Sequence, residues 1–429
     1  MSHQTGVGSY DILIVGGGPA GLMAAISAAH VGARVLMLEK GERLGKKLLI
    51  SGGGRCNVTN ARGTDYILRN IPGNPRFLQS VFTQWSSEDI MSFFEGLGVA
   101  LKEEDRGRMF PVTDRSSTVL SALVKHLQDM AVDVIFKAAV DRLWTDDGKL
   151  SGVFLNDGRM ISAPCVVVAT GGCSVPETGS TGDGYVLAKQ AGHTIIPPYP
   201  TSVPLLCNDF FIRDRLLQGV SLKDIEQTLY DSKGKVITRE EGDMIFTHFG
   251  ISGPATLRTS QYAVKAMQKS DVNSLLLAID LVPCKSADVL HKALRDAMLQ
   301  QPKRTFQNLL KDHLPNRLAE LVVRLLQIAD DHVCANVSTK ALEEALKLLK
   351  AFPVHVNGSL GLKRATVTGG GVNVKEINPS TMESKILSGL FFAGEVIDVH
   401  AHTGGYNITV AFSTGYVAGH HAATRVVLV

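Results

Sequence analysis

One glycine-rich turn near the start of the chain constrains the fold more than any other feature. The apolar segment 11–15 (DILIV) predicts a buried parallel strand, and it runs directly into GGGPAG at 16–21. An alanine-rich segment at 22–30 predicts a helix, and segment 34–38 (RVLML) predicts a second strand that Glu39 closes. The order of strand, Gly-x-Gly-x-x-Gly turn, helix, strand and acid is typical of a Rossmann-like dinucleotide-binding unit.

Each part of this unit has a physical role toward a dinucleotide. Gly16 permits the tight turn, Gly18 keeps side chains away from the pyrophosphate, and Gly21 lets the helix pack on the sheet. The carboxylate of Glu39 can accept hydrogen bonds from ribose hydroxyls and would repel a ribose phosphate. A glycine-rich turn in an ordinary α/β domain is the alternative. We assign to cofactor binding Gly16, Gly18, Pro19, Ala20, Gly21, Glu39 and Lys40.

A second glycine cluster follows at 45–60 (GKKLLISGGGRCNVTN). Its consecutive glycines would let backbone lie against a flat ring, and its basic residues could supply positive charge to a long cofactor. The alternative is a surface loop. The residues that we assign to the cofactor from this loop are Lys46, Ser51, Gly52, Gly53, Gly54, Arg55, Cys56 and Asn57.

Later segments decide between NAD and FAD, which one turn cannot do. Residues 138–168 predict a β-meander with hairpin turns at 146–149 and 156–159, and 166–170 predicts a buried strand. Such a meander is typical of FAD domains of the glutathione-reductase type, by analogy. Near the end, 390–393 predicts a strand and 408–423 a helix whose N-terminus could stabilise a reduced flavin. Further cofactor residues are Val140, Thr170, Gly171, Gly394, Glu395, Gly404, Gly405, Tyr406 and Asn407. A cofactor that residues from both ends of the chain contact must be long, and this favours FAD over NAD.

These motifs resemble the BaiN/RdsA family of NAD(P)/FAD-dependent oxidoreductases over essentially the whole chain. The segments that carry the resemblance are 49–60, 107–111, 178–184, 246–254, 392–395 and 403–407. The resemblance implies an α/β fold in which both chain ends build a Rossmann-like FAD domain around an inserted domain. It also implies reduction of carbon–carbon double bonds, in steroid-type enones or in uracil of ribosomal RNA. One stretch departs from the pattern: His400-Ala401-His402 stands where the family usually has an acid and a glycine.

The domain boundaries follow from composition. A length of 429 residues suggests roughly two or three domains, and the prolines at 197, 198 and 200 mark a crossing between them. We predict an FAD domain at 1–196, an insert at 197–363 and a return segment of the FAD domain at 364–429. Within the insert, 201–285 is strand-like and turn-rich, whereas 286–351 carries leucines at helical spacing.

Composition and charge exclude several classes of protein. A net charge of +3 with 20% charged residues does not indicate a nucleic-acid reader, and six cysteines without a Cys-x-x-Cys pair do not indicate a disulfide scaffold or a common metal site. No apolar run approaches the roughly 18 residues of a membrane span, and residues 1–10 are polar without a secretory pattern. We expect a soluble cytoplasmic protein with reduced thiols, no membrane partner and no bound metal. The oligomeric state stays open.

Three residues are candidates for chemistry. Cys56 could be an acid or a redox thiol, since the preceding Arg55 could lower its pKa; a small packing residue is the alternative. His248, in a glycine-flanked loop of the insert, could donate a proton or be a hydrogen-bonded structural histidine. Arg108 could hold an anionic or carbonyl group of a substrate, or be a surface arginine.

Three functions remain compatible with the sequence. The first is an FAD-dependent reductase of a small molecule with a polarised double bond, for which NADH or NADPH binds transiently as donor. The second reduces uracil in RNA, and the third is a non-catalytic flavin redox sensor. No second complete Gly-x-Gly-x-x-Gly unit is present for the nicotinamide, so another electron donor is an alternative.

Overall fold

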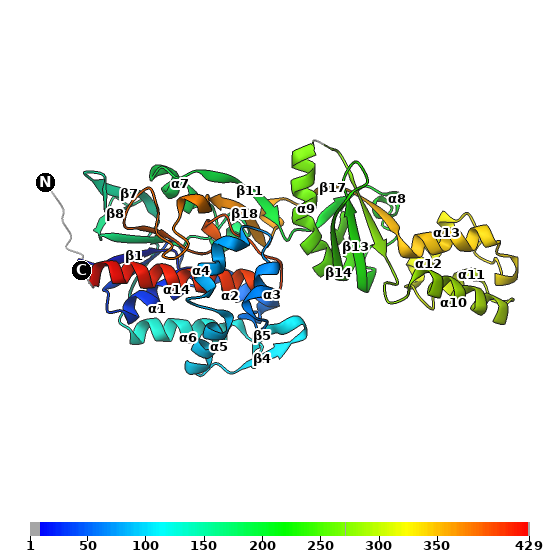
Figure 1. Cartoon of the computed structure of the whole chain (residues 1–429), viewed down its shortest axis with the longest axis horizontal. Coiled ribbons are helices and arrows are strands. Elements are labelled where there is room, and N and C mark those ends of the chain that lie inside the picture. Colours follow the sequence, from blue (N-terminus) through cyan, green and yellow to red (C-terminus); the bar gives the residue numbers. More distant parts are fainter. Residues whose placement is uncertain (1–8, 271, 428–429) are drawn as a thin grey trace. The chain divides into compact units, whose positions relative to one another are not determined.

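The computed structural model describes residues 9–270 and 272–427, which form two compact units (Figure 1). Unit 1 comprises Met1–Tyr199 with Thr366–Val429, and unit 2 comprises Pro200–Ala365. The polar start of the chain, at 1–8, lies outside the described residues. Unit 1 is therefore made from both ends of the chain.

A parallel five-stranded sheet is the centre of unit 1. Its strand order is β19-β10-β1-β2-β6, which is a Rossmann-like arrangement. The central strands are apolar runs that are buried on both faces, because the helices and the antiparallel meander of unit 1 pack on the sheet. Their bounds are Ile12–Val15 (β1), Val35–Glu39 (β2), Asp133–Phe136 (β6), Cys165–Val168 (β10) and Leu390–Phe392 (β19). The mixed α/β fold expected from the sequence is confirmed.

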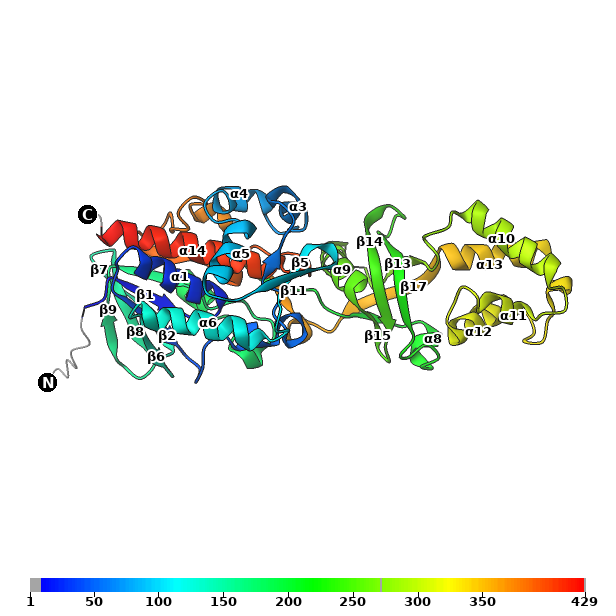
Figure 2. The ribbon, with the colours of Figure 1, turned by 90° about the horizontal axis from the view of Figure 1, so that it is seen from below.

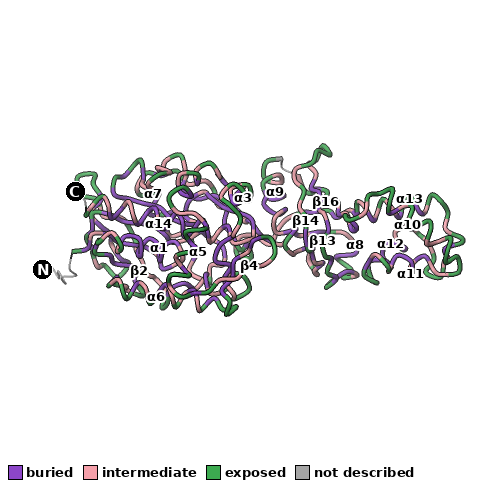
Figure 3. The backbone as a smooth tube through the Cα atoms, turned by 60° about the horizontal axis from the view of Figure 1, so that its bottom comes forward, coloured by how far each residue is buried: buried purple, intermediate pink, exposed green. Residues whose placement is uncertain are grey.

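Two helices from opposite ends of the chain pack directly together on this sheet. Figures 1 and 2 show α1 (Pro19–His30) and α14 (Tyr406–Val427) side by side. Both are buried along most of their length (Figure 3). A Cβ atom at Gly415 would lie 2.3 Å from the carbonyl oxygen of Ala20, and one at Gly419 only 2.0 Å from that of Ala24. The small-residue face of α14 thus brings the two backbones into contact.

The rest of unit 1 consists of smaller sheets and short helices. The predicted meander is present as an antiparallel sheet of β7 (Val140–Asp146), β8 (Lys149–Leu155) and β9 (Met160–Ser162). A second sheet has the order β3-β5-β4, and β11 pairs with β18. The remaining bounds are Lys46–Ile50 (α2), Thr59–Asn60 (β3), Thr64–Arg69 (α3), Gln79–Phe82 (α4), Ser87–Gly96 (α5), Leu101–Glu104 (β4), Arg108–Pro111 (β5), Ser116–Asp129 (α6), Asp183–Gln190 (α7), Ile195–Thr201 (β11) and Val367–Val372 (β18).

Unit 2 combines a closed β-barrel with a group of helices. The barrel order is β12-β15-β14-β13-β16-β17. The strands span Leu205–Cys207 (β12), Gly250–Ser252 (β15), Val236–Phe246 (β14), Ser221–Tyr230 (β13), Leu275–Asp280 (β16) and Phe352–Ser359 (β17). The helices are Phe210–Arg213 (α8), Pro254–Ser270 (α9), Ala287–Gln300 (α10), Phe306–Leu310 (α11), Asn316–Leu325 (α12) and Thr339–Lys350 (α13). Strands and helices share one apolar core.

One long helix interrupts the region that the sequence predicts to be strand-like. The 17-residue helix α9 lies within 201–285, and Pro254 is its first residue. Proline is well placed there, because the first helical residue needs no intrahelical hydrogen-bond donor. The strand-like interpretation of 201–285 is wrong for this segment. No helix in the described part of the chain is both long and apolar enough to cross a bilayer.

Candidate functional site

The first glycine turn has the geometry that a pyrophosphate requires. Gly16 has φ +107°, and a Cβ atom there would lie 2.7 Å from the carbonyl oxygen of Ala169. A Cβ atom at Gly21 would collide with the carbonyl oxygen of Gly16, at 1.9 Å. At Gly18, by contrast, nothing lies within 4 Å of a Cβ position, so this backbone faces open space at the start of α1. Two glycines serve close packing and one leaves room for a ligand.

The acid at the end of β2 is held by backbone amides. The carboxylate of Glu39 accepts hydrogen bonds from the N–H of Gly17 at 2.8 Å and from the N–H of Gly41 at 2.6 Å. This fixes its orientation beside the glycine turn, as a ribose-binding acid needs. Lys40 instead forms an ion pair with Asp183 of α7, at 2.5 Å. The meander lies nearby, since Ala138, two residues before Val140, donates its N–H to the carbonyl oxygen of Glu39.

The second glycine cluster forms a tight turn at Ser51–Gly54 with left-handed backbone at its glycines. Gly52, Gly53 and Gly54 are exposed and have φ values of +56°, +68° and +85°, which favour glycine. At Gly53 and Gly54 nothing lies within 4 Å of a Cβ position. The turn therefore presents bare backbone to open space.

The start of α14 meets this second loop. A Cβ atom at Gly405 would lie 2.6 Å from the carbonyl oxygen of Thr59 and 2.9 Å from Oδ1 of Asn57. The side chain of Asn60 donates to the carbonyl oxygen of Gly404 at 3.0 Å. Tertiary folding thus joins residues 57–60 to 404–405, some 350 positions apart in the sequence. Tyr406 is buried at this junction.

Asn407 organises the loop before α14. Its side chain accepts from the N–H of Ala401 and donates to the carbonyl oxygens of Ala401 and His402. The His400-Ala401-His402 departure therefore lies directly beside the helix start. Within the described residues, no group of three or more His, Cys, Asp or Glu side chains could hold a metal ion.

Glu395 takes part in a polar cluster. Its carboxylate pairs with Nζ of Lys47 at 2.7 Å and accepts from the N–H of Thr368 at 2.7 Å. Ser174 bonds to both Lys47 and Glu395. A Cβ atom at Gly171 would lie 4.0 Å from this carboxylate, so the predicted residues 171 and 395 do come together.

Two buried acceptors fit a bound cofactor. Among the described residues, Oδ1 of Asn57 and Oγ1 of Thr170 have no hydrogen-bond partner although both atoms are buried. Such atoms cost free energy unless a donor reaches them. Asn57 lies between the bare glycine backbone and the start of α14, where the N–H of a flat heterocycle would satisfy it. The residues present therefore fit a dinucleotide with a flat polar ring.

Cys56 does not have the reactive environment that the sequence predicts. It is fully buried in the core of unit 1, and burial raises the pKa of its thiol to about 12. The predicted influence of Arg55 is wrong, because Arg55 points to Glu104, at 2.6 Å, and to Asp114, at 3.2 Å. A buried thiol in this position stays protonated at neutral pH. These contacts favour the packing role of Cys56.

Of the other two candidates, Arg108 lies close to the second glycine loop and His248 belongs to unit 2. Arg108 pairs with Asp105, which holds the pKa of that carboxyl below its usual range. The Arg108 guanidinium also lies 5.4 Å from the ring centroid of Phe110. His248 is exposed in the turn between β14 and β15 of unit 2, with its ring edge-to-face with Phe249.

Several residues of the site were not expected from the sequence. Thr368 and Ser174 orient Glu395, and Asn60 joins the second loop to α14. The triple glycine at 369–371 was the available sequence signal for this region, because consecutive glycines indicate that another segment packs closely against the backbone there. Spacing alone does not say which segment approaches.

Comparison with known proteins gives the family. The pattern of the HI0933-like protein Rossmann domain matches residues 10–421. The chain is 31% identical to a ribosomal RNA dihydrouridine synthase of Haemophilus influenzae, over 94% of this chain and 96% of that protein. It is 30% identical to a 3-dehydro-bile acid delta(4,6)-reductase of Clostridium scindens, over 96% and 98%.

A solved structure supports the fold. The 3-ketosteroid delta1-dehydrogenase of Sterolibacterium denitrificans superposes with a TM-score of 0.51 at 13% identity, over 97% of this chain and 100% of that one. The two full-length relatives share more than the fold, since nearly every segment of the chain has its counterpart in them. The chain therefore belongs to the HI0933-like Rossmann family and is an oxidoreductase of the flavoprotein type.

Proposed function

We propose that this protein is an FAD-dependent reductase of a carbon–carbon double bond conjugated to a carbonyl group, with NADH or NADPH as electron donor. The observation that carries the proposal is the full-length similarity to two enzymes whose names describe such reductions. A bile-acid enone and uracil both contain a double bond polarised by a carbonyl. Uracil in RNA is the second candidate acceptor, because the relative at 31% identity is named for it.

The residues of unit 1 would bind and orient the cofactor. The open backbone at Gly18 would receive the pyrophosphate, and Glu39 would accept from the adenosine ribose. The bare turn at Gly53 and Gly54 would lie against the ring, with Asn57 as the acceptor for a ring N–H. When bound, FAD supplies the hydride chemistry, and the chain supplies position and electrostatics.

Hydride addition to a conjugated double bond also requires a proton. Cys56 is buried with a pKa raised to about 12, and Arg108 is bound to Asp105. His248 is exposed on unit 2. His248 remains the candidate proton donor that the sequence suggests, and Arg108 remains a candidate for holding the substrate carbonyl.

The visible spectrum of the purified protein tests the proposal. We expect a yellow protein that bleaches when NADH or NADPH is added without oxygen, and whose colour returns with a steroid-type enone or a uracil-containing RNA. Return of colour with neither acceptor would contradict the reductase proposal and support the redox sensor. A colourless protein that does not take up FAD would overturn the cofactor assignment itself.

A further inference from the structure

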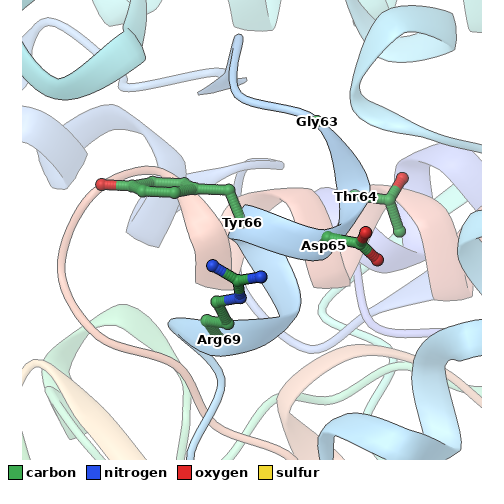
Figure 4. Close-up of a pocket in the computed structure, with 5 residues that line it drawn as sticks. All are labelled: Gly63, Thr64, Asp65, Tyr66 and Arg69. Carbon is green, nitrogen blue, oxygen red and sulfur yellow. The ribbon is translucent and has the colours of Figure 1, made fainter.

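A pocket lies on the short helix α3. Its volume is about 440 Å³, and Gly63, Thr64, Asp65, Tyr66 and Arg69 line it. It is a shallow depression that is open to solvent. Figure 4 shows the ring of Tyr66 extended on one side of the helix with the Arg69 side chain below it, and Thr64 and Asp65 on the other side.

The Tyr66 ring, the Arg69 guanidinium and the Asp65 carboxylate line this pocket, and the Arg62 guanidinium lies beside it. Tyr66 has an exposed fraction of 36%, and the guanidinium of Arg62 lies 5.2 Å from its ring centroid. Exposed tyrosine rings with arginine beside them are surfaces on which nucleobases stack. The pocket thus offers a stacking surface next to positive charge.

Arg69 in this pocket and Arg62 beside it differ from the arginines of the neighbouring loop. Arg55 and Arg108 are engaged by Glu104 and Asp105, respectively. Within the described part of the chain, neither Arg62 nor Arg69 has a carboxylate within ion-pairing distance, and both are exposed. Their charge is available to a phosphate group, which arginine binds with paired hydrogen bonds.

Hydrogen bonds attach the segment that carries this pocket to the flavin site. The side chain of Asn60 bonds to Gly404, and its Oδ1 accepts from the N–H of Arg62. At the other end of the segment, His402 donates its N–H to the carbonyl oxygen of Asn70 at 2.9 Å. Both ends of 60–70 are therefore fixed to the loop that leads into α14. A ligand in the pocket would lie at the edge of the site that Gly404 and Gly405 help to build.

We infer that the pocket at Tyr66 and Arg69, with Arg62 beside it, binds one nucleotide unit, with its base on Tyr66 and its phosphate at the arginines. The inference rests on the proposed function, which offers two sources of such a unit. One is the strand of an RNA acceptor next to the reactive uracil, and the other is the adenosine phosphate part of NADPH. The chemistry recognised is the same for both.

Binding measurements separate the two sources without requiring turnover. Fluorescence anisotropy of labelled oligo(U)12 reports the RNA arm, and quenching of NADPH fluorescence reports the dinucleotide arm. We expect Tyr66→Leu and the double variant Arg62→Gln/Arg69→Gln to bind one of the two ligands about ten- to a hundredfold more weakly. Tyr66→Leu removes the stacking surface, and the double variant removes the phosphate contacts. Tyr66→Phe keeps the ring and should bind like the wild type.

Arg142→Gln is the matched control, because Arg142 is also exposed and lies 4.3 Å from the ring centroid of Phe154, in the meander. This control variant should bind both oligo(U)12 and NADPH like the wild type. Weakening of the oligo(U)12 arm alone assigns the site to RNA, and weakening of the NADPH arm alone assigns it to the donor. Wild-type affinity of the Tyr66 and arginine variants in both arms would overturn the inference. Flavin content, measured on the same samples, shows separately whether the proposed function fails.

Discussion

Replacement of Gly419 by alanine should destabilise unit 1, although alanine is the better helix former. In an exposed helix interior the change from glycine to alanine stabilises by about 1 kcal/mol. In α14, however, the new methyl group would lie 2.0 Å from the carbonyl oxygen of Ala24 in α1. A backbone oxygen cannot rotate away as the tip of a side chain can. The two helices must separate until the contact reaches the ordinary range, which begins at 3.4 Å.

The size of the effect follows from overpacking. Extra methyl groups in well-packed cores cost about 1–3 kcal/mol, and here the obstacle is rigid backbone on a helix that carries the glycine turn. Because the obstacle is rigid, we take the upper end of this range, about 3 kcal/mol, and subtract about 1 kcal/mol for helix propensity. The expected net loss in the free energy of unfolding is about 2 kcal/mol. With a urea m-value of about 2 kcal/mol/M, the unfolding midpoint should fall by about 1 M.

Tryptophan fluorescence during urea unfolding is the appropriate assay. The chain has two tryptophans, Trp85 and Trp144, and both lie in unit 1. Trp85 stacks on Tyr416 of α14 with a centroid separation of 3.7 Å, so its signal reports the helix that is perturbed. Gly96→Ala is the control, since nothing lies within 4 Å of a Cβ position at this last residue of α5. An unfolding midpoint for Gly419→Ala equal to or above that of Gly96→Ala would refute the reasoning.

Three further predictions concern the site and its surroundings. Glu39→Gln should raise the dissociation constant for FAD about tenfold or more, because a charged hydrogen-bonding group is lost. A flavin titration measures this constant, and Glu42→Gln, at an exposed position, is the control. His248→Asn should slow acceptor reduction about a hundredfold, as expected for a lost general acid, and leave reduction by the nicotinamide unchanged in stopped-flow traces; equal slowing of both steps would exclude this role. Burial lowers the pKa of His193 below its usual value of 6.5. As the pH falls, His193 is therefore protonated in the unfolded chain before it is protonated in the folded protein, and the stability of the folded protein should fall as the pH drops below 6.5. His193→Gln should flatten that decline in urea midpoints between pH 6.5 and 5.5, and an unchanged pH dependence would remove His193 as its cause.

The local parts of the fold could be predicted from sequence because they depend on neighbouring residues. The apolar run before Gly16 specifies a buried strand, and the alanines after Gly21 specify a helix that packs closely. Turn residues at 146–149 and 156–159 specify the hairpins of the meander. Helix α9 was missed, because strand-like segments surround it on both sides and Pro254 gave only a weak signal for its start.

The chemistry of individual side chains could not be predicted in this way, because it depends on long-range packing. Sequence adjacency suggested that Arg55 lowers the pKa of Cys56, yet the fold directs Arg55 to Glu104 and buries the thiol. A pKa depends on burial and on charges nearby in space, and neither is encoded in the order of two residues.

The sequence alone determined the dinucleotide-binding unit and the family, since both reside in short motifs whose backbone requirements are local. Only the tertiary structure decided that residues 57–60 meet Gly405 and that Thr368 orients Glu395. These contacts join segments that are separated by many residues along the chain. They form because the core of unit 1 brings both chain ends to one sheet, and the free energy of burying that core belongs to no single motif.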